Sequence, residues 1–387
     1  MTKKKLKILH IMSGFGGGIS SFIQNKAKYM VNESIQFDVI TYDKCSKEFK
    51  ESIHQTGGSI YTMVNPKKEG WKAFRDSFIP VLKENTYDII YCHLNGYRIL
   101  PYYYYARKYS KAPFYVHSHS SHYPKSMLSK GKQFNIQLDQ LINRKLTDKI
   151  VGCGSLSINH IFGESVREEE MVVIPNSVEV ERFIKTPEES AKLREKHRAD
   201  YELADDELVI GHIGRIRTIK NHKLTIKLAE KIKEQHLRMK ILIIGEGDEE
   251  AEIKEIVKEK GLTNIITFTG RISPIEDFFP TLDVMLLPSF AEGLPTVVVE
   301  AQASGIPVVM SDTITEEVDL GFNLLETVSI NADSTEWIEA IEKTQKVLIP
   351  EANVRKQAII EKNFSNETSA NLYIEFLRGN VSQYTIH

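Results

Sequence analysis

Two glutamates flank a segment whose pattern suits the binding of an anion. Glu292 and Glu300 lie eight residues apart, after the apolar run 284–287, which predicts a buried parallel strand. Pro295 suits the first turn of a helix, so Glu292 should lie in the loop and Glu300 inside that helix. The backbone N–H groups expected at the positive helix end, where a phosphate can be held, are those of Gly293, Leu294 and Thr296. A surface loop with an unrelated, solvated helical glutamate is the alternative for this spacing alone.

Two cations follow another predicted strand upstream. Arg215 and Lys220 lie five residues apart, between the apolar strand 210–213 and a helical pattern at 224–232. Arginine offers a planar fork and lysine a mobile point charge, and both suit phosphate oxygens, including those of a leaving group that gains negative charge. Two cations at a strand end are often only solvated, so the pair gains meaning from the glutamate segment that follows it.

A glycine-rich turn opens the chain. The segment 13–21 follows a predicted strand and opens a helix, and Gly17 and Gly18 are best placed for close approach of a ligand to the backbone. The turn is not a dinucleotide fingerprint, because Ile19 occupies the position of the third glycine. It also lacks the Gly-Lys-Ser/Thr of a Walker loop.

Three histidines follow the predicted strand 114–116. His117 and His119 share one face of an extended segment, which could suggest a metal site, and His122 lies nearby. No acidic residue adjoins them, so we expect no bound metal. Structural histidines at a strand end are the alternative to a role in binding.

In their order along the chain, these motifs resemble the retaining nucleotide-sugar glycosyltransferases of family 4. The motifs that carry the resemblance are Gly214-Arg215 with Lys220, the segment Glu292 to Ala301, and the upstream Ile174-Pro175-Asn176-Ser177-Val178. The resemblance covers nearly the whole chain, including the glycine-rich opening, the strand-glycine pattern 241–247 and the turn 268–271. The opening and the histidines resemble exopolysaccharide or capsule-cluster members from Gram-positive bacteria.

The resemblance implies an α/β fold of the GT-B type, with two Rossmann-like doubly wound domains facing a central cleft. It implies a retaining, metal-independent hexosyltransferase that uses a nucleoside diphosphate sugar, expected to be a UDP-sugar, and no cofactor. The acceptor would be a glycan, expected to be lipid-linked. The leaving phosphate would itself take the acceptor proton on the same face of the sugar.

The resemblance also implies roles for the motif residues. Arg215 and Lys220 would stabilise the leaving phosphate, Glu292 would orient the hexose hydroxyls, and Glu300 would accept hydrogen bonds from the ribose. Either His117 or His119 would lie close to the donor sugar. The nucleobase of the donor would lie against the backbone of Gly270, Arg271 and Ile272. Gly17 and Gly18 would approach the donor diphosphate or the acceptor.

Length and composition agree with two α/β domains. The chain has 387 residues, of which 41% are hydrophobic, and a formal net charge of −2, which gives no nucleic-acid signature. Three widely spaced cysteines suggest neither a disulfide framework nor a zinc cluster. The opening residues show no signal peptide, and no apolar run approaches ~18 residues. We therefore expect a cytoplasmic protein, with peripheral contact at the inner face of the membrane as one option.

The alternation of strands and helices predicts two domains joined near Pro175. Predicted strands of the first domain are 7–12, 36–41, 89–92, 114–117 and 149–152, and those of the second begin near 208 and continue at 240–244, 265–269, 283–287 and 307–310. We assign 1–175 plus 366–387 to an acceptor-side domain and 176–365 to a nucleotide-sugar domain. The helix 367–377 would return to the first domain, and the charged stretch 187–207 should form a solvated helix and turn.

Two stretches rich in basic residues remain open to two interpretations. Residues 97–111 hold six tyrosines and no acid, and residues 125–149 hold six basic residues against two acids. Amphipathic basic helices with aromatic residues can lie on anionic lipid, but such helices also occur as ordinary packing elements.

Other functions remain open from the sequence. A nucleotide-sugar epimerase of the same fold would turn over the donor without an acceptor. A glycosidase would use Glu292 and Glu300 as acid and base, but the two cations would then have no purpose. A non-catalytic subunit would bind a sugar nucleotide and transfer nothing.

Overall fold

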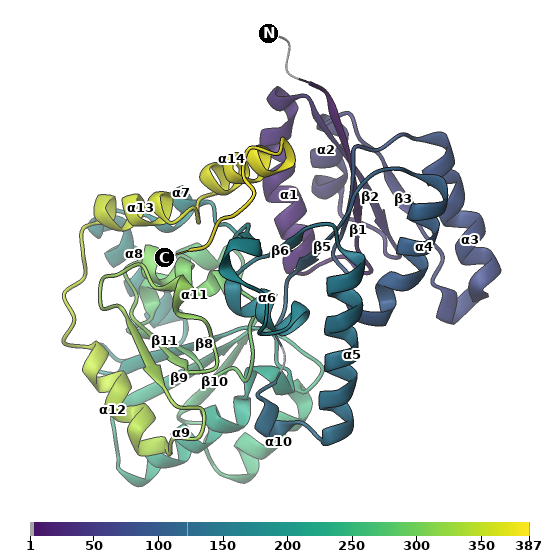
Figure 1. The fold of residues 1–387 in the computed structure, drawn as a ribbon. Helices are drawn as coiled ribbons and strands as arrows, with labels where there is room; N and C mark the ends of the chain where they lie inside the picture. The colour runs from purple at the N-terminus through teal and green to yellow at the C-terminus, as the bar shows by residue number, and fades with distance from the viewer. Residues whose placement is uncertain (1–3, 122, 387) are drawn as a thin grey trace. The chain divides into compact units, whose positions relative to one another are not determined.

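The computed structural model describes residues 4–121 and 123–386, which form two compact units. The first unit runs to Ser177 and also includes the chain from Asn366 onward, and the second unit spans Val178–Ser365. Each unit contains one parallel β-sheet with helices packed around it (Figure 1).

The sheet of the first unit has seven parallel strands in the order β3-β2-β1-β4-β5-β6-β7. The strands are β1 Leu6–Ile11, β2 Ile35–Thr41, β3 Ile60–Thr62, β4 Ile89–Cys92, β5 Phe114–Ser118, β6 Ile150–Gly152 and β7 Met171–Val173. Ile8 of β1 lies opposite Phe37 of β2 and Ile89 of β4, and all three are buried. Because helices cover both faces of such a sheet, its central strands are almost continuously apolar.

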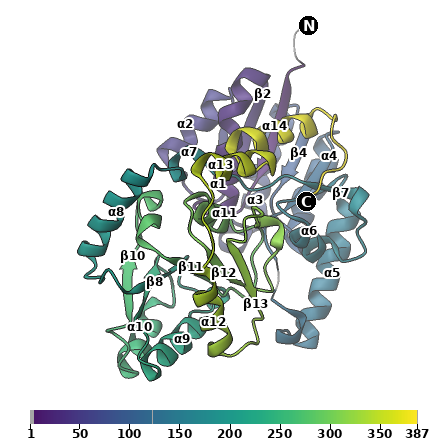
Figure 2. The ribbon, with the colours of Figure 1, turned by 90° about the vertical axis from the view of Figure 1, so that its left-hand side faces the viewer.

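Helices of the first unit include a C-terminal helix that returns to the N-terminal segment. The α-helices are α1 Gly18–Met30, α2 Lys47–Gln55, α3 Pro66–Glu84, α4 Leu100–Tyr109, α5 Lys130–Leu146, α6 Ser155–Phe162 and α14 Asn366–Leu377. Ala370 and Tyr373 of α14 belong to the same apolar core as Phe22 and Ile23 of α1. Figures 1 and 2 both show α14 beside α1.

A buried lysine ties three segments of the first unit together. The Lys26 ammonium of α1 donates hydrogen bonds to the hydroxyls of Ser369 at 2.6 Å and Ser177 at 3.1 Å. Burial lowers the pKa of Lys26 to about 7, because the charged form loses its hydration. The segment that leaves the first unit and the helix that returns to it therefore share one hydrogen-bonded anchor.

The sheet of the second unit has six parallel strands in the order β10-β9-β8-β11-β12-β13. The strands are β8 Leu208–Ile213, β9 Met239–Ile244, β10 Ile266–Gly270, β11 Val284–Leu287, β12 Val308–Ser311 and β13 Leu325–Val328. The α-helices are α7 Val180–Phe183, α8 Pro187–Asp200, α9 His222–Glu234, α10 Glu250–Glu259, α11 Thr296–Ala303, α12 Ser334–Thr344 and α13 Ala352–Glu361. Trp337 of α12 is fully buried in the core of this unit.

Helix α8 confirms the solvated helix that its charge pattern predicts, except for the face that carries Arg194 and Arg198. Arg194 and Arg198 each place a guanidinium nitrogen 2.6 Å from a carboxylate oxygen of Asp283, immediately before β11. Arg198 is buried, so one face of this charged helix packs on the unit through ion pairs.

Three strands were absent from the sequence prediction, and all three lie at sheet edges. They are β3, β7 and β13, each only three or four residues long. A strand this short shows too few residues for a period of two to be recognised, and an edge strand is not covered on both sides.

Candidate functional site

The loop after β8 packs directly against the loop after β9. The Gly214 N–H donates to the Ile244 carbonyl at 3.0 Å. A Cβ on Gly245 would lie 2.0 Å from the Gly214 carbonyl oxygen, and a Cβ on Gly247 would lie 2.1 Å from that of Ile216. Glycine at these two positions therefore allows the two backbones to touch.

This loop carries a lysine that pairs with a distant glutamate. Lys220 ends the short 3-10 helix η5 (Thr218–Lys220), and its ammonium lies 2.7 Å from a carboxylate oxygen of Glu292. Both side chains are only 16% exposed. The Phe290 N–H donates to the Ile219 carbonyl at 2.9 Å and fastens the two loops together. The structure thus unites the cation predicted to hold a phosphate with the acid predicted to hold a hexose.

Arg215 lies in the same loop, five residues before Lys220, and its side chain is exposed. Gly214 leaves room for the lysine stem, since a Cβ there would lie 3.0 Å from Lys220 Cε. One loop therefore presents an exposed guanidinium and a half-buried ammonium, the two kinds of cation that suit phosphate oxygens.

Glu300 lies on α11, one turn inside the helix. Burial raises the pKa of Glu300 to about 7, the Thr296 hydroxyl opposes that rise by hydrogen bonding, and the nearby Glu276 carboxylate adds to it. Glu276 is itself paired with Arg182, at 2.6 Å. Glu300 therefore changes charge near neutral pH.

Pro295 caps α11 rather than entering its first turn, a shift of one residue from the prediction.

The remaining predicted contacts of the nucleotide lie at nearby strand ends of the same unit. Gly293 and Leu294 lie in the turn between β11 and α11, and Thr296 is the first residue of α11. Gly270 ends β10 with a φ of 69°, and its carbonyl accepts the Gly245 N–H at 2.9 Å. The turn formed by Gly270, Arg271 and Ile272 thus begins beside the glycine loop after β9.

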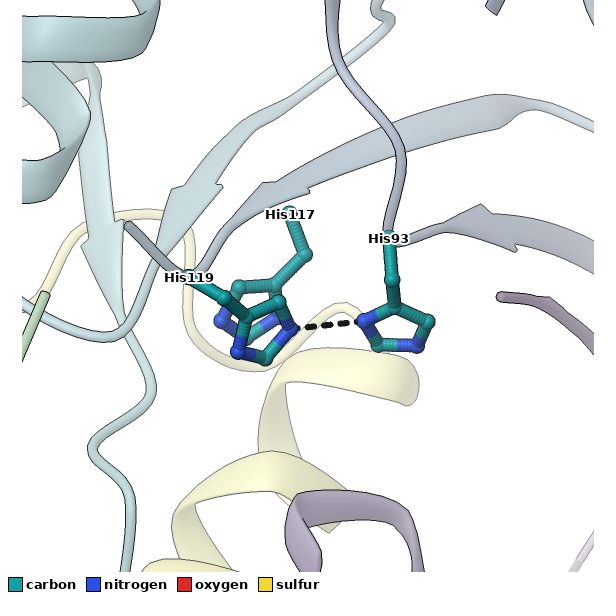
Figure 3. Close-up of side chains that lie close together, drawn as sticks. All are labelled: His93, His117 and His119. Atoms are coloured by element: carbon teal, nitrogen blue, oxygen red, sulfur yellow. Dashed lines mark hydrogen bonds between the residues drawn. The ribbon is translucent and has the colours of Figure 1, made fainter. Parts of the chain in front are cut away.

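The first unit holds a chain of hydrogen-bonded histidines. His93 Nδ1 lies 2.7 Å from His119 Nε2, and His93 Nε2 lies 3.0 Å from His10 Nδ1 (Figure 3 shows the first contact). His117, in β5, pairs through Nδ1 with the Tyr91 hydroxyl at 3.0 Å. Burial is the main cause that lowers the pKa of His10 and of His119 to about 3, so these rings are neutral at physiological pH.

Nitrogen atoms of His93, His117 and His119 lie within 4.8 Å of one another, close enough to raise the question of a metal. The rings of His117 and His119 are stacked, however, with centroids 4.1 Å apart and planes 11° apart. Lone pairs in parallel planes do not converge on one ion, and His93 and His119 are hydrogen-bonded to each other. The cluster fits a hydrogen-bonded network better than a tetrahedral metal site.

Sequence reasoning identified only part of this cluster. The sequence prediction missed His10 and His93. His10 lies near the end of β1 and His93 directly after the adjacent strand β4. Isolated histidines in apolar runs give no signal without the strand order. His122, which the sequence placed with His117 and His119, lies outside the described residues.

The glycine-rich opening is held by a serine. Gly17 caps α1 and Gly18 begins it, and the Gly17 N–H donates to the Ser20 hydroxyl at 3.1 Å. Within the described chain, a Cβ on either glycine would meet no atom within 4 Å. Packing does not require glycine here, so the open space leaves room for a ligand. Gly16, with a φ of 93°, is the position whose backbone favours glycine.

Comparisons with known proteins agree with this arrangement. Residues 16–182 match the model of Glycosyltransferase Family 4, and residues 193–346 match that of Glycosyl transferases group 1. EpsF of Bacillus subtilis (strain 168), which is named as a glycosyltransferase, is 30% identical over 94% of each chain.

Solved structures share the fold at lower identity. Anabaena HepE, crystallised with UDP and glucose, has a TM-score of 0.75 and 20% identity and covers 97% of this chain and 100% of its own. WaaG, described as a glycosyltransferase involved in lipopolysaccharide biosynthesis, has a TM-score of 0.69 and 13% identity over 96% of this chain and 100% of its own.

Proposed function

This chain belongs to the family 4 glycosyltransferases and has their GT-B fold, and from this premise we propose that it moves a hexosyl unit from a UDP-sugar to a glycan acceptor with retention of configuration. The observation that carries the proposal is the contact between Lys220 and Glu292, which joins the loop after β8 to the loop after β11; Arg215 lies in the same loop as Lys220. Two cations and an acid on fixed loops can hold a diphosphate and a hexose side by side.

The proposed reaction needs stabilisation of a leaving group. The bond from the hexose anomeric carbon to the UDP phosphate oxygen breaks, and a bond from the acceptor hydroxyl oxygen forms on the same face. The acceptor proton passes to the leaving phosphate oxygen. Arg215 and Lys220 stabilise the charge that this phosphate gains, and charges held in place before the reaction are effective in this role. Glu292 orients the hexose hydroxyls.

Binding of the nucleotide falls to the neighbouring strand ends. Glu300 accepts hydrogen bonds from the ribose hydroxyls, and the base lies against the turn that follows Gly270. The backbone of Gly293, Leu294 and Thr296 faces the phosphates from the positive end of α11. His119, directly after β5, or His117, inside it, serves the donor sugar. The chemistry requires no divalent metal, since the two cations supply the positive charge.

The acceptor is proposed to be a growing, lipid-linked saccharide of exopolysaccharide or capsule synthesis. Within the described residues, no helix combines the length and the apolar character needed to cross a bilayer. One face of α5 exposes Phe134, Leu138 and Leu141. The basic residues of this helix are Lys130, Lys132, Arg144 and Lys145. Exposed apolar side chains among cations suit the surface of an anionic membrane.

The tyrosine-rich helix α4 supports the proposed membrane contact only in part. Tyr102 is buried against Phe74 and Phe78, so it has a packing role, whereas Tyr104 is exposed.

Flotation with vesicles that contain phosphatidylglycerol tests the membrane contact. Wild-type protein should float with them and Phe134→Glu should not; equal flotation of both would contradict it.

A screen of nucleotide sugars for thermal stabilisation tests the donor proposal. A ligand that binds only the folded protein raises its melting temperature, by linkage. We expect a UDP-sugar to stabilise the wild-type chain and to stabilise Lys220→Ala much less. If no nucleotide sugar shifts the transition, the donor assignment is wrong. A stabilising donor that is epimerised but never transferred to any acceptor would identify an epimerase instead.

A further inference from the structure

A cavity of about 510 Å³ opens in the first unit, at the carboxyl ends of β1, β2, β3 and β4. Its floor includes the buried apolar side chains of Met63 and Leu94. Its volume lies in the range of small-molecule sites, and ligands of doubly wound sheets bind off this edge. The residues assigned above to the donor do not line it; its lining includes the start of the glycine-rich turn and the beginning of the tyrosine-rich stretch 97–111.

Two aromatic side chains on the wall of this cavity are unusually exposed. Trp71 is 60% exposed and Tyr97 is 57% exposed. Gly70, with a φ of 85°, interrupts α3 immediately before Trp71, and the indole packs edge to face on Phe74 with centroids 5.8 Å apart. The indole is thus fixed at one edge while much of its surface meets solvent, an arrangement that suits contact with the apolar C–H face of a pyranose ring.

The position of Tyr97 is also built into the fold. The Tyr97 N–H donates to a carboxylate oxygen of Asp139 on α5 at 2.9 Å, and the preceding Gly96 N–H donates to the Asn143 side-chain oxygen at 2.7 Å. A Cβ on Gly96 would lie 2.2 Å from the Asp139 carboxyl carbon, so glycine is required there. This wall of the cavity is anchored on the same helix that exposes Phe134.

Three cations line the cavity: Lys67, Lys68 and Arg98. Among the described residues, none of them forms an ion pair with a carboxylate, and Arg98 donates a hydrogen bond to the Asn95 side-chain oxygen at 3.4 Å. The charge of Arg98 is felt inside the cavity. Burial raises the pKa of Tyr42, the hydrogen bond with the Tyr102 hydroxyl opposes that rise, and the positive charge of Arg98 opposes it to a smaller extent.

Two acids share the lining, Asp43 and Glu69. One carboxylate oxygen of Asp43 accepts the Phe15 N–H at 3.0 Å, and a Cβ on Gly14 would lie 3.2 Å from it. Asp43 is therefore held by the turn after β1, and its other oxygen can accept a hydrogen bond from a sugar hydroxyl. The cations outnumber the acids and lie after β3 and β4, whereas Asp43 lies after β2.

We infer that this cavity binds an acidic sugar residue of the acceptor. The ring stacks on Trp71 or Tyr97, its hydroxyls bond to Asp43, and its anionic group meets Arg98 and the two lysines. The anion could be a hexuronate carboxylate or a phosphate attached to the sugar, since both offer oxygens that a guanidinium binds. This inference rests on the proposed function, because it identifies the class of acceptor for that reaction.

Binding without donor tests the inference independently of transfer. Three probes are titrated into the full chain while the indole signal of Trp71 is followed by NMR: methyl glucuronide, glucose 1-phosphate and the neutral methyl glucoside. We expect at least one anionic sugar to bind roughly tenfold more tightly than the glucoside, a difference of about 1.4 kcal/mol. Equal binding of all three, or binding of none, would overturn the inference. Tight binding of methyl glucuronide alone indicates that the acceptor carries a hexuronate. Tight binding of glucose 1-phosphate alone indicates that it carries a phosphorylated sugar.

Two variants assign the effect to the cavity. Arg98→Gln should remove the preference for the anionic sugar. Trp71→Ala should weaken all three sugars together, and because its indole is gone, binding to this variant is followed through the NMR signals of the sugars themselves. Lys111→Gln, an exposed lysine after α4 that does not line the cavity, is the matched control and should keep the preference. An unchanged preference in Arg98→Gln would contradict the inference. Stabilisation by UDP-sugar should be the same in all three variants, so failure of donor binding is detected separately.

Discussion

The ammonium of Lys220 lies 2.7 Å from a carboxylate oxygen of Glu292, although 72 residues separate them. Both belong to loops at the carboxyl edge of one parallel sheet, where neighbouring strands β8 and β11 end together. With no donor bound, each side chain satisfies the charge of the other. A bound diphosphate would take over the lysine, and a bound hexose would take over the glutamate, so the pair keeps the two groups in place before substrate arrives.

Loss of either predicted phosphate cation should impair transfer. Lys220→Ala and Arg215→Ala are each expected to lower kcat by roughly 10²-fold or more, the scale for removing a preorganised charge contact from a transition state. The measurement is steady-state transfer, with the melting temperature as a check on folding.

Lys227→Ala is the matched control, because Lys227 is an exposed lysine on α9, directly after the same loop. It should retain wild-type turnover. Wild-type turnover in both Lys220→Ala and Arg215→Ala would show that the diphosphate lies elsewhere.

Nucleotide binding should depend on pH through Glu300. Its pKa in the free protein is raised to about 7, and only the carboxylate accepts two hydrogen bonds from the ribose hydroxyls. Affinity for UDP should therefore rise between pH 6 and pH 8. The same dependence should be absent in Glu300→Gln, and a wild-type affinity that is flat over this range would argue against the ribose contact.

Buried histidines should make the first unit sensitive to acid. The pKa of His10 falls from 6.5 to about 3 on folding, so the unfolded chain binds a proton that the folded chain does not. The contribution of neutral His10 to the free energy of unfolding is fully present above pH 6.5 and is lost as the pH falls toward 3. At pH 5 the loss attributable to His10 is about 2 kcal/mol.

Urea unfolding at pH 7.5 and pH 5 measures this effect. His10→Phe, which fills a similar volume, should lose less stability than wild type between the two pH values. An equal loss of stability in both proteins would contradict the lowered pKa of His10 in the folded chain.

Removal of divalent ions should leave transfer intact. The stacked rings of His117 and His119 do not converge on one ion, and the proposed reaction draws its positive charge from Arg215 and Lys220. Enzyme treated with EDTA and assayed in metal-free buffer should keep its activity. Complete loss that only a divalent cation restores would show that the proposed chemistry is wrong.

Sequence reasoning succeeded where residues carry local signals. The GT-B fold and the family follow from motifs at strand ends, such as Glu292 to Ala301, whose order along the chain is specific. The short edge strands β3, β7 and β13 have no such signal. The contact between Lys220 and Glu292 could not be predicted, because it depends on the strand order and on side-chain rotamers rather than on any one motif.

The same limit applies to His10 and His93. Each lies in an apolar run, and only the pairing of β1 with β4 brings them together and next to His119. The cavity beside Trp71 likewise combines residues that follow four different strands. Sites of this kind appear in the folded chain and leave no motif in the sequence.

The most direct test of the donor site compares the two glutamates. Calorimetric titration with UDP of wild type, Glu292→Gln and Glu300→Gln, followed by transfer assays, separates nucleotide binding from chemistry. The account predicts that Glu300→Gln binds UDP more weakly, whereas Glu292→Gln binds UDP much as wild type does and loses transfer, because the hexose is no longer held for reaction. Equal weakening of UDP binding in both variants would contradict it.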